Sequence, residues 1–130
     1  MFMEVKNLRR IECITAILNV SNMESSLDFY INILGFQNAA WGNEYFTSVS
    51  RNNTGIYLCA NGQGQPGTWI WVGIDGDIFA LYEELLSKGI IIKMPPQNFS
   101  WAMEMHVFDP DGHVLRFGTD PDESMPFADR

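Results

Sequence analysis

The sequence predicts an α+β protein made of two tandem βαβββ modules, whose curved mixed sheets surround a concave cleft with the helices outside. Three observations predict it. Each half of the 130-residue chain contains a strand-like run, a helical run and a hairpin, in that order. The two hairpins, 45–61 and 104–120, align at one offset, and a glycine follows each helical run, at Gly35 and Gly89. Such self-similarity is typical of a duplicated supersecondary unit.

Module 1 is expected to span about residues 11–61. The β-branched run "IECITAILNV" predicts a strand over 11–20. Ser21 and Glu24 have the S-x-x-E spacing of a capping box, so a helix of about three turns should begin after Ser21 and end at Gly35. The segments "YFTSVSR" and "IYLCAN", joined by the turn "NNTG", predict a hairpin.

Module 2 is expected to span about residues 67–120, after the boundary loop "GQGQPG". "TWIWVGI" predicts a strand, and Asp77 is a suitable N-cap for a helix over "IFALYEELLSK" that ends at Gly89. "EMHVF" and "HVLRF", joined by "DPDG", predict the second hairpin. An acidic C-terminal tail, 119–130, completes a single domain of 1–130.

Composition excludes several classes of partner. The formal net charge is −8, with 16 acidic and 8 basic residues, so a nucleic acid is not expected as a partner. No apolar run approaches the roughly 20 residues that a membrane span needs, and the N-terminus "MFMEVKNLRR" lacks the apolar block of a signal peptide. We therefore expect a cytoplasmic protein that does not bind membranes.

Strand alternation separates the residues that face the helices from those that line the cleft. Leu115 and Phe117 should face the helix layer, so Arg116, between them, should point into the cleft, where solvent can reach it. The cleft-facing set on this pattern is Thr15, Ile17, Asn19, Tyr57, Trp69, Trp71 and Arg116.

The segments "NVSNMESSLDFYINILGF" and "FDPDGHVLRFG" resemble the vicinal oxygen chelate superfamily, which includes glyoxalase I, ring-cleaving dioxygenases and bleomycin-resistance proteins. The resemblance covers nearly the whole chain and implies the fold above, but the superfamily carries several chemistries on one scaffold. Its enzymes usually hold a divalent metal with four strand residues. The corresponding positions here are Thr15, Tyr57, Trp69 and Arg116.

None of these four side chains is a normal ligand at such a site, so the resemblance predicts no metal, no other cofactor and no catalytic residue. His106 and His113 lack matching carboxylates on one face and are interpreted as structural. Whether the chain is an enzyme stays open, and the sequence favours a protein that is not one.

The segments "GTWIWVGIDGDIFALYEEL" and "SWAMEMHVFDPDGHVLRF" resemble most closely the bleomycin-resistance proteins, metal-free acidic homodimers that sequester a cationic glycopeptide between subunits. Their ring-stacking positions correspond to Phe46, Trp69 and Trp101. The resemblance therefore implies a homodimer that sequesters a planar aromatic ligand, such as a cationic antibiotic. The expected ligand-binding residues are Phe46, Tyr57, Trp69, Trp71, Trp101, Glu104 and Arg116.

Two questions remain open at this level. Arg116 would repel a cationic ligand unless Glu104 neutralises it; otherwise an anionic or neutral planar ligand fits better. Two other function classes also remain: a glyoxalase-like or dioxygenase-like enzyme, either metal-dependent or a lyase or isomerase with Glu104 or His106 as general base, and an interaction module whose cleft is vestigial.

Overall fold

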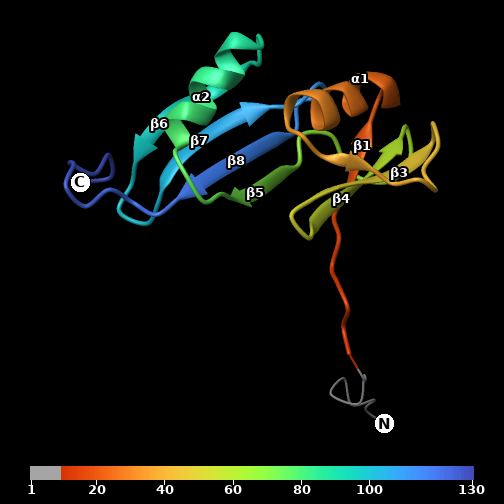
Figure 1. Cartoon of the computed structure of the whole chain (residues 1–130), viewed down its shortest axis with the longest axis horizontal. Helices are drawn as coiled ribbons and strands as arrows, with labels where there is room; N and C mark the ends of the chain where they lie inside the picture. Colours follow the sequence, from red (N-terminus) through yellow and green to blue (C-terminus); the bar gives the residue numbers. More distant parts are fainter. Residues whose placement is uncertain (1–9) are drawn as a thin grey trace.

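The computed structural model describes residues 10–130, which form two four-stranded mixed sheets, each with a helical segment on one face (Figure 1). The first sheet has the order β1-β4-β3-β2 and the second β5-β8-β7-β6. This confirms the predicted fold class. Within this range no helix is long and apolar enough to cross a membrane.

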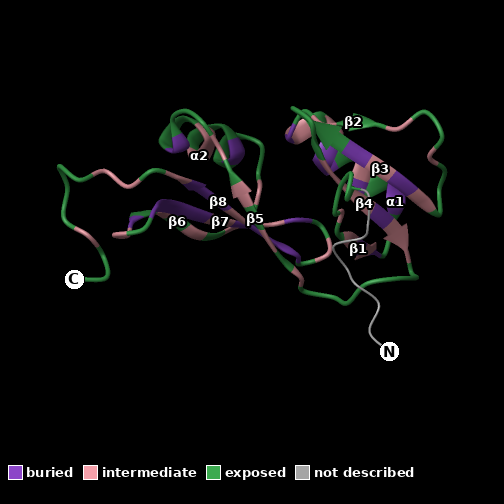
Figure 2. Cartoon of the chain, turned by 90° about the horizontal axis from the view of Figure 1, so that it is seen from below, coloured by how far each residue is buried: buried purple, intermediate pink, exposed green. Residues whose placement is uncertain are grey.

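The first sheet, sheet A, and its helical segment are built from the first half of the chain. β1 pairs in parallel with β4, whereas β3 is antiparallel to both β2 and β4. The elements are β1 (Ile17–Val20), α1 (Met23–Leu27), a π-helical segment η2 (Asp28–Ile33), β2 (Gln37–Asn38), β3 (Phe46–Arg51) and β4 (Thr54–Ala60). Figure 2 shows the alternation along β3, where buried residues alternate with less buried ones.

Sheet B and α2 repeat the plan in the second half. β5 pairs in parallel with β8, and β7 is antiparallel to both β6 and β8. Helix α2 packs on β6, β7 and β8. The elements are β5 (Trp69–Gly73), α2 (Ile78–Ser87), β6 (Ile92–Asn98), β7 (Met103–Phe108) and β8 (Val114–Thr119).

The core lies between each sheet and its helical segment. It contains the side chains of one strand parity, such as Leu18 and Val20 of β1 and Leu115 and Phe117 of β8, all at most 4% exposed. The remaining members of the core are Met23, Phe29, Tyr30, Leu34, Val49, Leu58, Ile78, Leu85, Met103, Met105 and Val107. The opposite faces of both sheets carry no helix (Figure 1).

Two local predictions were wrong. The first strand begins at Ile17 rather than at residue 11, so Ile14 precedes the strand and is 91% exposed. The N-cap of α1 is Asn22, whose side chain accepts a hydrogen bond from the backbone N–H of Ser25, rather than Ser21. The Ser21 N–H instead donates to Asp111 at 2.8 Å.

The predicted βαβββ plan includes a strand between each helix and its hairpin, but the sequence assigned no residues to these two strands, which are β2 and β6. β6 contains Pro95 and Pro96, which cannot donate to a ladder and therefore argue against a strand. The structure accommodates them because β6 is the edge of sheet B and its pairing with β7 shifts register twice. The predicted caps at Asp77, Gly35 and Gly89 are confirmed, the two glycines having φ of 75° and 74°.

The acidic turn between β7 and β8 joins the two modules. Asp109 is buried and accepts hydrogen bonds from the Tyr30 hydroxyl at 2.8 Å and from the backbone N–H groups of Asp111 and His113. Burial raises the pKa of Asp109, and its hydrogen bonds only partly oppose this. The polar residues of "DPDGH" therefore have a structural role.

His113 adds a second connection between the modules and is fully buried. Its Nε2 lies 2.7 Å from the carbonyl oxygen of Asn19 in β1, and its Nδ1 accepts from the Thr68 backbone N–H at 3.0 Å. Because Nδ1 accepts, the proton is assigned to Nε2, which donates to Asn19. This contact fixes β1 of sheet A beside the start of β8.

Candidate functional site

The helix-free face of sheet B carries a row of large polar and aromatic side chains across three strands. Trp71 of β5 lies opposite Arg116 of β8, and Arg116 lies opposite His106 of β7. These residues share a parity that excludes Leu115 and Phe117, which belong to the core. Glu104 lies two residues before His106 and so belongs to the same face, although it is only 1% exposed.

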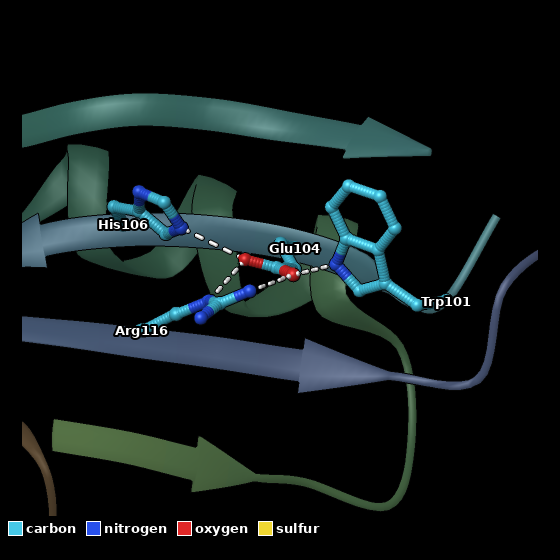
Figure 3. A network of polar contacts seen from close by, with 4 residues as sticks. All are labelled: Trp101, Glu104, His106 and Arg116. Atoms are coloured by element: carbon cyan, nitrogen blue, oxygen red, sulfur yellow. Dashed lines mark hydrogen bonds and ion pairs between the residues drawn. The ribbon is translucent and has the colours of Figure 1, made fainter. Parts of the chain in front are cut away.

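Glu104 is the centre of this face (Figure 3). One carboxylate oxygen, Oε1, accepts from Arg116 Nε at 2.6 Å and lies 2.9 Å from His106 Nε2. The other, Oε2, accepts from Arg116 Nη2 at 2.7 Å and from the Trp101 indole N–H. The pair with Arg116 is therefore bidentate, and the buried carboxylate has a donor on every side.

The hydrogen bonds from Arg116 hold the pKa of Glu104 at about 2, although burial opposes the shift. Glu104 is thus ionised at neutral pH and can only accept hydrogen bonds. His106 Nε2 must then carry a proton and donate to Glu104, and Nδ1 has no hydrogen-bond partner within residues 10–130. Glu104 is a poor general base, whereas His106 retains one basic nitrogen.

Three tryptophans surround this network and expose about half of their surface. Trp69 is 53% exposed, Trp71 is 52% and Trp101 is 56%. The Trp69 ring meets the edge of His106, with ring centroids 5.3 Å apart, and Trp101 stacks on Phe99, with centroids 4.9 Å apart and an interplanar angle of 5°. Each indole is therefore supported on one side and accessible on another.

Trp71 is held by its two flanks. The Arg116 guanidinium lies 5.2 Å from the centre of its ring, a cation–π contact. On β8 the ring covers Gly118, where an added Cβ would lie 2.2 Å from Trp71 Cη2. The sheet therefore has room for this indole because position 118 lacks a side chain.

A second aromatic group lies on sheet A. The ring of Phe46 in β3 is 5.2 Å from that of Tyr57 in β4, and Trp41, from the preceding loop, lies 6.3 Å from both. Trp41 is 60% exposed, while Phe46 and Tyr57 are half-buried. Of these three rings, strand alternation predicted Tyr57 and the family resemblance implied Phe46, whereas neither indicated Trp41.

The structure thus divides the expected ligand-binding residues into two groups. Trp69, Trp71, Trp101, Glu104 and Arg116 come together on sheet B, and Glu104 does pair with Arg116. Phe46 and Tyr57 lie on sheet A, and no ring contact joins the two groups within residues 10–130.

Sequence reasoning missed two residues of the two groups, Trp41 and Phe99, because both are in loops, where alternation gives no direction. His106 was interpreted as structural and named as a general base only in the alternative function. Its cleft-facing parity, shared with Glu104, is the signal that places it at the site.

The residues present do not fit a superfamily-type metal centre. Arg116 occupies one expected ligand position with a permanent cation that binds Glu104, and Trp69 occupies another with an indole. Thr15 precedes β1 rather than lying in it. Within residues 10–130 no three His, Cys, Asp or Glu side chains are placed to hold a metal ion. That the protein uses no metal stays a prediction.

Comparisons with known proteins agree with this architecture. Solved structures with the same fold include an antibiotic-binding protein from Streptomyces sp. CB03234, with a TM-score of 0.69 and 21% identity over 85% of this chain and 99% of that one. A glyoxalase/dioxygenase from Nostoc punctiforme has a TM-score of 0.71 and 18% identity over 94% of this chain and 98% of that one. A virulence protein from Salmonella typhimurium has a TM-score of 0.72 and 21% identity over 85% of this chain and 98% of that one.

These identities are low enough that the structural likeness shows the fold alone. No curated protein matches the chain. The model of one protein family, however, matches residues 10–117, which is most of the sequence. The chain therefore belongs to the Glyoxalase/Bleomycin resistance protein/Dioxygenase superfamily.

Proposed function

We propose that the protein sequesters a planar aromatic small molecule between its two aromatic faces and performs no chemistry on it, as in the bleomycin-resistance branch of the superfamily. The observation that carries this proposal is the set of half-exposed tryptophans, Trp69, Trp71 and Trp101, around the buried Glu104–Arg116 pair. Clustered exposed aromatic surface is typical of binding sites. Fixed indoles can stack on a planar ligand without further ordering.

The charge of the site favours a cationic ligand. Arg116 is neutralised by a bidentate contact with Glu104, so a ligand cation meets no unpaired guanidinium. The formal charge of −8 attracts cations at long range. One protein of the same fold is an antibiotic-binding protein, which supports an antibiotic as the ligand class but does not bear on its charge.

We further propose that the binding protein is a homodimer in which the aromatic face of sheet A from one subunit meets that of sheet B from the other. The separation of the two aromatic groups within one chain supports this arrangement. A second support is the segment 10–16, which extends away from the body and exposes Ile11 by 65% and Ile14 by 91% (Figure 1). Such an apolar extended segment suits contact with a second copy.

The first test is calorimetric titration of the full chain with bleomycin, proflavine as a planar cation, pyrene-1-sulfonate as a planar anion and 2-naphthol as a neutral ring. The same sample is analysed for metal. We expect saturable binding of bleomycin or proflavine and no stoichiometric metal. Binding of the anion alone would contradict the proposed positive charge of the ligand. Bound Zn, Mn or Fe would contradict the proposal as a whole.

A subunit-mixing experiment tests the shared cleft. One variant carries Trp41→Ala and Phe46→Ala on sheet A, and the other carries Trp69→Ala and Trp101→Ala on sheet B. If each cleft combines two subunits, a mixed dimer regains one intact cleft, whereas clefts within one chain would all stay damaged. In purified mixed dimers, recovery of half the wild-type binding sites is expected, and no recovery would contradict the shared cleft.

The alternative function is a metal-free lyase or isomerase, and His106 is the residue that favours it. Its Nε2 is bound to Glu104 while Nδ1 is left as a base, the arrangement used in general-base catalysis. Substrate turnover that His106→Gln abolishes, while proflavine binding is unchanged, would move the conclusion to this enzyme class.

A further inference from the structure

The C-terminal segment, residues 120–130, is attached to the loop that carries Trp101. It follows β8 and lies at the end of sheet B far from sheet A (Figure 1). Its backbone and side chains contact Asn98, the last residue of β6, and Ser100 in the loop between β6 and β7. A segment whose composition suggests only a solvated acidic tail is therefore bound at two points.

Asn98 is the inner attachment point and is only 7% exposed. Its side-chain oxygen accepts from the Asp122 N–H at 2.9 Å, and its side-chain nitrogen donates to the Asp122 carbonyl at 2.7 Å. Its backbone carbonyl accepts from the Ala128 N–H at 2.7 Å. A buried amide whose polar atoms are satisfied by the segment is costly to release.

Asp129 is the outer attachment point. Its Oδ1 accepts from the Ser100 backbone N–H at 2.8 Å, and its Oδ2 accepts from the Ser100 hydroxyl at 2.7 Å. These two bonds hold the pKa of Asp129 below its usual range. Ser100 lies between Phe99 and Trp101, whose rings stack on each other. The Asp129 carboxylate therefore fixes the residue that separates the stacked pair.

We propose that Asp129 is a positioning residue for the ligand site: through Ser100 it holds the stacked Phe99–Trp101 pair at the rim of the cleft. The ligand part of this inference rests on the proposed function, whereas the positioning part does not. Glu104 fixes the indole N–H of Trp101 and Asp129 fixes the backbone beside it, so that Trp101 is held at both ends.

The test uses full-length protein labelled with 5-fluorotryptophan, whose ¹⁹F resonance for Trp101 is assigned with Trp101→Phe. Asp129→Asn and Ser100→Ala each remove part of the attachment. Glu123→Gln is the matched control, because it removes one negative charge from the same segment and Glu123 has no side-chain partner among the described residues. We expect both attachment variants to shift or broaden the Trp101 resonance and to leave that of Trp41 unchanged.

The same variants are titrated with proflavine. Loss of the charge-assisted bonds should weaken binding by about threefold to tenfold in Asp129→Asn, while Glu123→Gln should match wild type. Thermal unfolding of each sample excludes global destabilisation. If Asp129→Asn does not fold, Ser100→Ala provides the same comparison.

The outcomes separate the two claims. An unchanged Trp101 resonance in both attachment variants would overturn the positioning role, whatever the ligand result. A changed resonance with unaltered affinity in a protein that binds proflavine would overturn the effect on the ligand site. A changed resonance in a protein that binds no member of the ligand panel would support positioning and contradict the proposed function.

Discussion

The two sheets share one arrangement of strands, yet their helix-free faces differ in chemistry. On sheet A, Trp41, Phe46 and Tyr57 touch only through their rings, and no ion pair accompanies them within the described residues. On sheet B the tryptophans surround Glu104, which binds Arg116, His106 and Trp101. Aromatic contacts alone restrict the position of a side chain only loosely, whereas hydrogen bonds restrict it closely because they depend on direction.

The difference teaches that the two copies would contribute different things to a shared cleft. Sheet A offers apolar area that a range of flat ligands could use. Sheet B offers indoles at fixed places, and it has a charge pair that determines which ligands are tolerated. Substitutions on sheet B should therefore affect both the positions of the indoles and the affinity for the ligand. Substitutions on sheet A should affect the affinity alone.

The largest effect should come from Glu104→Gln. The change leaves Arg116 without its anion and places an amide among donors, so we expect a loss of about 2–4 kcal/mol in the free energy of unfolding. Urea unfolding at pH 7 measures it, with Glu123→Gln as the surface control. A loss no greater than that of the control would contradict the central role of Glu104.

The pH dependence of the stability lost in Glu104→Gln tests whether the ion pair on sheet B is the source of that stability. The pKa of Glu104 is lowered from 4.5 to about 2, so its contribution to stability is complete above about pH 4.5 and disappears as the pH falls towards 2. The difference in unfolding free energy between wild type and Glu104→Gln should shrink over that range. A difference that stays constant from pH 5 to pH 2.5 would show that the ion pair is not its source.

Trp69→Ala should weaken proflavine binding by about 1–3 kcal/mol, since one stacking surface is removed. The cost in unfolding free energy should be smaller, because the indole is already 53% exposed. Calorimetric titration and urea unfolding on the same sample separate the two. Reduced stability with unaltered affinity would support the reading of this face as a vestigial cleft in an interaction module.

The fold was predictable because its signals are local and repeated. Gly35, Gly89 and Asp77 occupy cap positions that backbone geometry restricts, and alternation placed Arg116 and Trp71 on the correct face. The Glu104–Arg116 pair was left open because it joins neighbouring strands whose register depends on the turn between them. The residues of β6 were not assigned because its two prolines are compatible with a strand only at a sheet edge.

Other features depend on tertiary contacts that no local pattern encodes. Trp41 and Phe99 join the aromatic groups from loops, and the C-terminal segment docks through Asn98, a residue with an unremarkable local sequence. Phe46 and Tyr57 lie on a different sheet from the tryptophans of sheet B, and the contacts of Asp109 and His113 that join the two modules are likewise tertiary.

The smallest effect should come from Gly118→Ala. Its Cβ would lie 2.2 Å from Trp71 Cη2, so the indole must tilt away. Replacing glycine also stabilises the folded strand by about 0.5–1 kcal/mol, because the unfolded chain has less conformational freedom to lose. These two effects oppose each other, and the unfolding free energy should change little. Proflavine affinity should nevertheless fall by less than about 1 kcal/mol, because Trp71 leaves its contact with Arg116.

Gly73→Ala is the milder comparison, since its Cβ would lie 3.2 Å from the Trp71 indole nitrogen and should displace the ring less than Gly118→Ala does. Fluorescence of Trp71 in a background with the other tryptophans replaced by phenylalanine reports the tilt directly. If Gly118→Ala altered stability but left both the emission of Trp71 and the affinity unchanged, position 118 would matter to the strand and not to the site. The reverse result would show that order on sheet B, rather than aromatic area, sets the affinity.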